Sequence, residues 1–119
     1  MYYTGTDGKP YPAEKNVRTV GGQSVTTWTR EIVDCNILEV EVGTNGYQGG
    51  DTGHGGRTYV RIKDEASTDL SCSIVEDRLR RGGVEEVEIT LGGDSELATF
   101  KEALRWILSI LEVQSEKGE

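Results

Sequence analysis

Long apolar runs are missing from this sequence. None approaches the roughly 20 residues that a helix needs to span a bilayer. The first eight residues, Met-Tyr-Tyr-Thr-Gly-Thr-Asp-Gly, also lack the basic region followed by an apolar one that marks a secretory signal. We therefore expect no membrane contact and a cytoplasmic location.

Basic residues are scarce relative to acidic ones. The 119 residues include 13 Lys and Arg against 21 Asp and Glu, which gives a net charge of −8. Because duplex nucleic acid binds mainly through Lys and Arg that neutralise phosphates, this balance argues against duplex nucleic acid as a partner. An anionic ligand would need a local basic pocket that works against the overall field.

Residues that bind metals or carry redox chemistry are few. Cys35 and Cys72 lie far apart in strand-like segments, so we expect two buried free thiols. His54 is the only histidine, and a zinc site wants three or four ligands. We expect no metal and no cofactor, although an oligomer could combine ligands from several chains.

The pattern that is present indicates one α+β domain over residues 1–119. Apolar and polar residues alternate with period two in several segments, which predicts half-buried antiparallel strands. Together these segments suggest a sheet of about five to six strands packed against one long C-terminal helix. Residues 1–15 contain both prolines and predict an extended arm with turns. The predicted strands are 23–32, 37–42, 57–63, 68–75 and 84–91, with a hairpin-like link at 64–67.

Residues 94–113 predict the helix, because Asp94 or Ser95 is a good N-cap after two glycines. Apolar residues form two stripes that together cover roughly 220° of its circumference, more than a helix lying on a sheet needs to bury. The first stripe holds Leu97, Phe100, Leu104, Ile107, Leu108 and Leu111, and the second holds Ala103, Trp106, Ile110 and Val113. We expect the second stripe to form the interface of a homo-oligomer, because two-fold self-association is the commonest symmetry. The alternative is that the N-terminal arm covers it within one chain.

The loop 43–57 carries the strongest functional signal. Seven glycines fall within 42–58, and glycine lets backbone N–H groups approach a ligand closely and form an anion-binding nest. Arg57 could hold a phosphate or carboxylate in a bidentate fork, and His54 and Tyr47 could stack on a base. The loop fits neither a Walker A nor a dinucleotide motif, so a plain long hairpin loop is the alternative. The predicted ligand-binding residues are Tyr47, Gly50, Asp51, Thr52, Gly53, His54, Gly55, Gly56, Arg57 and Thr58.

A catalytic role has weaker support. Asp51 and His54 are three residues apart and could pair as a base and its orienting group. No Ser or Cys nucleophile lies in a recognisable setting, so we expect a protein that is not an enzyme and assign no catalytic residue.

The segment Gly49-Gly50-Asp51-Thr52-Gly53-His54-Gly55-Gly56-Arg57-Thr58, with Leu91-Gly92-Gly93-Asp94-Ser95-Glu96-Leu97, resembles small proteins of bacteriophages and mobile elements. Within that group it is similar to the phage anti-Thoeris sponge proteins of the first described type. This resemblance implies a non-enzymatic oligomer in the host cell cytoplasm that sequesters a cyclised ADP-ribose, or a cyclic oligonucleotide, as a counter-defence. It also implies that Arg57 contacts a phosphate.

The runner-up hypothesis is an acidic inhibitor that binds a host nuclease or defence protein. Glu39, Glu41, Glu86 and Glu88 would then line the wet face of adjacent strands and imitate nucleic acid.

Overall fold

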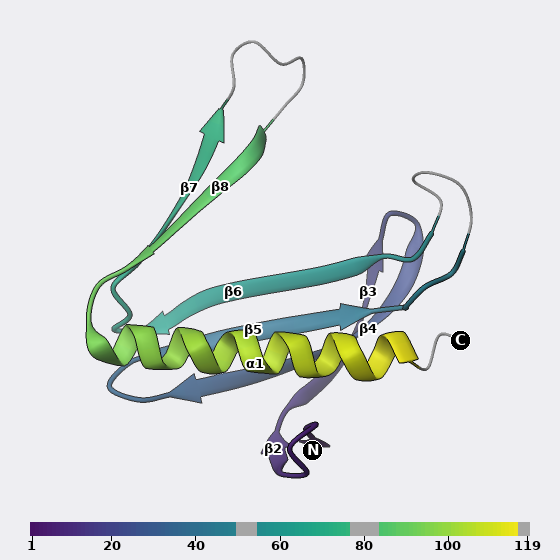
Figure 1. The fold of residues 1–119 in the computed structure, drawn as a ribbon, viewed down its shortest axis with the longest axis horizontal. Coiled ribbons are helices and arrows are strands. Elements are labelled where there is room, and N and C mark those ends of the chain that lie inside the picture. Colours follow the sequence, from purple (N-terminus) through teal and green to yellow (C-terminus); the bar gives the residue numbers. More distant parts are fainter. Residues whose placement is uncertain (50–54, 77–83, 117–119) are drawn as a thin grey trace.

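The computed structural model describes residues 1–49, 55–76 and 84–116 and is an α+β fold (Figure 1). It has eight strands in three antiparallel sheets and one C-terminal helix. In chain order the elements are β1 (Tyr2–Thr4), β2 (Pro10–Pro12), β3 (Glu14–Val20), β4 (Gln23–Val33), β5 (Ile37–Thr44), β6 (Thr58–Ala66), β7 (Leu70–Glu76), β8 (Val84–Leu91) and α1 (Asp94–Glu116). The predicted fold class is therefore confirmed.

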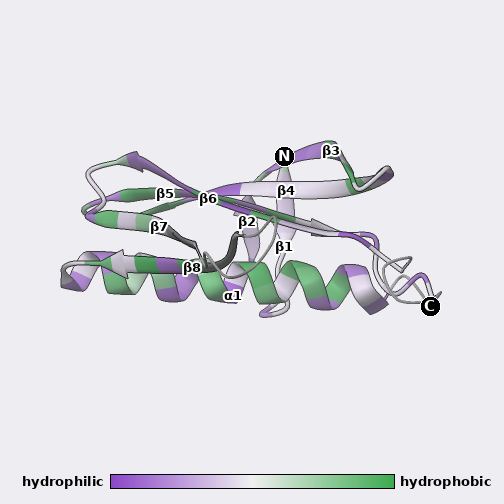
Figure 2. Ribbon diagram, turned by 90° about the horizontal axis from the view of Figure 1, so that it is seen from above, coloured by the Kyte–Doolittle hydropathy of each residue, from purple (hydrophilic) through white to green (hydrophobic). Residues whose placement is uncertain are grey.

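The central sheet has four strands in the order β3-β4-β5-β6. The helix α1 lies along β5 and over part of β4, so sheet and helix form two layers (Figure 2). Alternation along β5 decides which side chains face the helix, because successive residues of a strand point to opposite faces. Leu38, Val40 and Val42 are fully buried and pack in one cluster with Ala103 and Trp106 of α1.

The opposite face of the sheet buries a carboxylate. The Glu41 side chain is 0% exposed, and Arg18 donates to it through Nε and Nη2 at 2.7 and 2.6 Å. The Thr27 hydroxyl donates to it at 2.7 Å, and Arg61 Nε donates at 3.1 Å. Hydrogen bonding from Arg18, helped by Thr27 and Arg61, lowers the pKa of Glu41 to about 2 against the opposing effect of burial. Through these three partners the buried carboxylate on β5 links all four strands of the central sheet.

The N-terminal arm folds over the helix. The Tyr3 ring lies 5.4 Å and the Tyr11 ring 5.9 Å from the Trp106 ring, centroid to centroid. Trp106 is 2% exposed, and Ile110 is fully buried.

The predicted oligomer interface is therefore wrong in its choice of stripe. Ala103, Trp106 and Ile110 belong to the core of the single chain, and Val113 is half-buried. The alternative, in which the arm covers this stripe within one chain, is what the structure has. The stripe left exposed is the other one, with Leu97 at 58%, Leu104 at 49% and Leu108 at 58%.

Strands β7 and β8 do not join the central sheet but form a separate hairpin that projects from the body (Figure 1). The predicted hairpin link at 64–67 is wrong, because β6 and β7 do not pair. Ser67 has a φ of 58°, in the left-handed region that non-glycine residues seldom adopt, and this turns the chain away from β6. The Asn36 amide then pins the turn, since it donates to the hydroxyls of Thr68 at 2.9 Å and of Thr99 at 3.0 Å.

Two smaller expectations also differ. Cys35 and Cys72 are free, as expected, but both are exposed instead of buried. The strand β3 was not predicted and adds an edge to the sheet. Within the described ranges, no helix has both the length and the apolar character needed to cross a membrane.

Candidate functional site

The described part of the loop 43–57 is fastened to the turn between β3 and β4. The Asn45 side-chain amide donates to Gln23 Oε1 at 2.6 Å, and Gln23 Nε2 donates to the Gly55 carbonyl at 3.1 Å. The Arg57 backbone N–H donates to Asn45 Oδ1 at 2.7 Å, and Asn45 N–H donates to the Arg57 carbonyl at 3.1 Å. The two ends of the loop are therefore joined to each other and to the side chain of Gln23, which follows the β3–β4 turn.

Arg57 supports this loop from within. Its Nη1 donates to the Gly55 carbonyl at 2.8 Å and to the Gly56 carbonyl at 3.3 Å. The guanidinium lies so close to Gly21 that a Cβ there would collide with Nε. Its position favours a role in shaping the loop. Its predicted contact with an anion stays a prediction.

The C-terminal part of α1 is fixed against the same region. The Thr44 N–H donates to Gln114 Oε1 at 2.7 Å, and Gln114 Nε2 donates to the Thr26 carbonyl at 3.0 Å. One amide side chain thus joins α1 to β4 and to the end of β5. Gly43 permits this arrangement, because a Cβ there would meet the Thr26 carbonyl.

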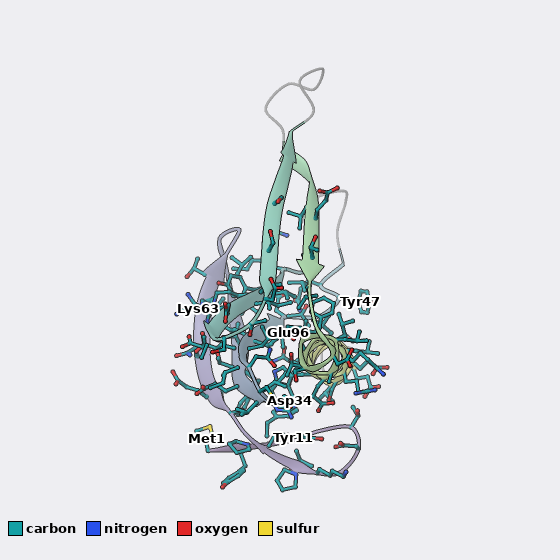
Figure 3. All side chains as sticks on the ribbon, turned by 90° about the vertical axis from the view of Figure 1, so that its left-hand side faces the viewer. Met1, Tyr11, Asp34, Tyr47, Lys63 and Glu96 are labelled. Atoms are coloured by element: carbon teal, nitrogen blue, oxygen red, sulfur yellow. The ribbon has the colours of Figure 1, made fainter. Side chains whose placement is uncertain are left out.

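Between the loop and α1 lies a groove of about 620 Å³, which we call the loop groove. Its walls have two sources, the backbone of the loop and the outward side of the last helical turns. Tyr47 is 81% exposed and projects on the α1 side of the sheet (Figure 3). The described lining is Thr44, Gly46, Tyr47, Gln48, Gly49, Gly55, Gly56, Thr58, Leu108, Leu111, Glu112 and Ser115.

The lining combines apolar side chains with polar groups. Leu108 and Leu111 offer aliphatic surface, while hydroxyls, one amide and glycine backbone offer hydrogen bonds. Among the described lining residues, Glu112 is the only charged side chain. Such a surface suits a flat, partly apolar molecule with hydrogen-bonding groups at its edge.

The predicted site residues divide into three groups. Tyr47, Gly55, Gly56 and Thr58 line the loop groove together, as expected of neighbours in one site. Arg57 is next to the groove but does not line it. The remaining predicted residues, Gly50, Asp51, Thr52, Gly53 and His54, lie outside the described residues.

The helical half of the groove was not predicted. Leu108, Leu111, Glu112 and Ser115 come from α1, some 50 residues beyond the loop in sequence. The available signal was that the two apolar stripes of the helix together exceed what a sheet can bury. Leu108 and Leu111 belong to the first stripe, whereas the outward role was predicted for the second.

A second hollow, of about 370 Å³, lies between the N-terminal arm and α1. Two of its basic side chains pair with one carboxylate, that of Glu102. Arg30 lies 4.0 Å from the centroid of the Tyr11 ring and donates to Glu102 at 3.1 Å. Arg105 donates to the same carboxylate at 3.2 Å. We interpret this hollow as part of the contact between arm and helix.

The acidic face required by the inhibitor hypothesis is not formed as predicted. Glu41 is buried among arginines, and Glu39 pairs with Arg61 at 2.9 Å. The strands that carry Glu86 and Glu88 belong to a different sheet from β5, so the four residues do not share adjacent strands.

Comparisons with known proteins give no further guide: no family model, no curated protein and no solved structure matches this chain. The resemblance to phage sponge proteins therefore stays a prediction.

Proposed function

We propose that this protein is a non-enzymatic binding protein that sequesters a small nucleotide-derived molecule in the loop groove. The observation that carries the proposal is the preformed groove itself. Its loop wall is held by the bonds among Gln23, Asn45 and Arg57, and its helix wall by Gln114. A site whose walls are ordered in advance loses little conformational entropy when a ligand binds.

The lining supports a nucleoside-like guest. A base could lie against Leu108, Leu111 and the Tyr47 ring. Flat heterocycles stack on aromatic rings and pack against aliphatic side chains whatever their hydrogen-bonding pattern. The Thr44 and Thr58 hydroxyls, 3.0 Å apart, and the Ser115 hydroxyl could bond a ribose. Glycine backbone of the loop is suited to phosphate groups, which fits the predicted anionic ligand.

The resemblance in residues 49–58 supports the same class of ligand. It favours a cyclised ADP-ribose or a cyclic oligonucleotide as the ligand. It also favours a role for this protein in phage counter-defence. We further propose a cytoplasmic location, because two exposed free thiols are typical of a reducing compartment.

We also propose that the protein is a homo-oligomer. A stripe of exposed leucines runs along α1, and large apolar surfaces on small proteins usually have a partner.

Thermal unfolding and calorimetry with a defined panel test the function. Cyclic ADP-ribose, linear ADP-ribose, cyclic di-AMP and AMP would each be titrated into the protein. We expect at least one cyclic compound to raise the melting temperature and to be recovered chemically unchanged.

Ser115→Phe is the informative variant, because the ring would fill the groove from its helical wall. It should lower the affinity by about tenfold or more, equivalent to at least ~1.4 kcal/mol. Ser24→Phe is the matched control, since Ser24 is exposed in the β3–β4 hairpin. Equal binding by wild type and Ser115→Phe would show that the ligand sits elsewhere, and conversion of the ligand would show an enzyme.

A further inference from the structure

The surface of α1 that faces away from the sheet is apolar along much of its length. At about 100° per residue, Leu97, Leu104 and Leu108 fall within about 40° of one another. They lie about 160° from the buried line through Trp106 and Ile110. We call these three leucines the outer stripe. All three are about half exposed, so nothing in the described part of the chain covers them.

Charges flank the outer stripe in an ordered way. Lys101 lies beside it in the first half of α1, and Glu112 lies on the same side in the second half. Both residues are exposed. Asp94 and Arg105 lie on the same flank, so its charges run acidic, basic, basic and acidic along α1. When two copies run antiparallel, the basic Lys101 of one can meet the acidic Glu112 of the other.

We propose that the outer stripe binds the outer stripe of a second copy of this chain, with the two helices antiparallel across a two-fold axis. The evidence for this contact is independent of the proposed function. Only its consequence, that the second copy completes the loop groove, rests on the proposed function. In this register Leu104 lies opposite Leu108 of the second copy, and Leu97 lies opposite Ser115 of the second copy.

The same register brings the flanking charges together. At about 1.5 Å per residue, Lys101 is about 4.5 Å along the axis from Leu104. Glu112 of the second copy is about 6 Å from its own Leu108 in the same direction. The two side chains are therefore level, and the symmetry produces two such pairs in each dimer.

This contact would complete the binding site. Leu108, Glu112 and Ser115 line the loop groove and also lie in the proposed interface. Lys101 of the second copy would stand at the mouth of the groove, beside the only charged side chain in its described lining. It would offset the repulsion between Glu112 and an anionic guest, and the groove would be incomplete in a lone chain.

Sedimentation velocity on the full chain tests the contact. We expect the wild type to sediment at twice the 13.1 kDa chain mass and Leu97→Glu plus Leu104→Glu to sediment as a monomer. Neither residue lines the groove of its own chain. Val17→Glu, at a residue 66% exposed on β3, is the matched control and should remain dimeric. Circular dichroism would establish that each variant is folded.

Charge reversal tests the register. Lys101→Glu or Glu112→Lys alone should weaken dimerisation by about tenfold, and the two together should restore it. Three results would each overturn the proposal. The wild type could be monomeric, the dimer could persist in Leu97→Glu plus Leu104→Glu, or the double charge reversal could dimerise no more tightly than the single reversals. Titration of cyclic ADP-ribose into the same samples separates the two claims. A wild type that is monomeric and binds cyclic ADP-ribose would support the proposed function and contradict the dimer contact. A wild type that is dimeric and binds no member of the nucleotide panel would support the contact and contradict the function.

Discussion

Replacing Glu41 by Gln would measure how much the buried carboxylate stabilises the fold. The carboxylate is fully buried and accepts hydrogen bonds from Arg18, Thr27 and Arg61. Glutamine keeps the shape and one acceptor oxygen but loses the negative charge. Both arginines would then lose the negative charge that they share, although Arg61 keeps its ion pair with Glu39.

The magnitude follows from the pKa. The pKa of Glu41 falls from 4.5 to about 2 in the folded protein. A depressed carboxyl pKa contributes stability that is fully present above the unfolded value and is lost as the pH falls towards the folded value. The shift corresponds to about 3 kcal/mol at pH 7, of which about 2 kcal/mol is lost by pH 3.

Urea unfolding followed by the fluorescence of Trp28 and Trp106 is the assay. We expect the difference in unfolding free energy between wild type and Glu41→Gln to shrink steadily from pH 7 to pH 3. Glu39→Gln is the control, because the Glu39 side chain is 23% exposed and its pair with Arg61 should be worth less than about 1 kcal/mol. A difference that does not change with pH would refute the reasoning, since it would mean that Glu41 has an ordinary pKa.

Three further changes test other parts of the structure. Tyr3→Phe should leave the melting temperature unchanged or raise it, because the buried Tyr3 hydroxyl has no hydrogen-bond partner among the described residues, and a lower melting temperature would contradict this. Gly43→Ala should cost about 2 kcal/mol or more in urea unfolding, whereas Gly55→Ala, with only a 3.4 Å contact, should cost less than about 1 kcal/mol. Arg57→Ala should speed amide hydrogen exchange in the loop 43–57 while Arg105→Ala leaves it unchanged, and equal exchange in both would show that the guanidinium does not hold the loop.

The sequence predicted those parts of the fold that depend on local periodicity. The helix and five strands lie close to their expected bounds. The spacing of their apolar residues indicates which face of each element is buried, and this spacing predicts the element type and its length. β3 was missed because Glu14–Val20 is an edge strand with mostly exposed and half-exposed residues, so its pattern is weak. The detached hairpin depends on the backbone at Ser67 and on the Asn36 contacts, neither of which has a periodic signal.

Only the loop half of the candidate site was predicted from the sequence. Glycine density identified the loop, whereas Leu108 and Ser115 come from an element far away in sequence. Both stripes of α1 are apolar, so composition alone does not decide which one faces the sheet. The decision depends on Tyr3 and Tyr11, which pack against Trp106 from the other end of the chain.

The most direct test of the loop groove is to find what it holds. The purified protein would be exposed to extracts of phage-infected cells, washed, denatured by heat, and its supernatant analysed by mass spectrometry beside that of Ser115→Phe. We expect an intact nucleotide-derived molecule, near one per chain, from the wild type and little from the variant. An empty supernatant, or the same amount from both proteins, would contradict the account.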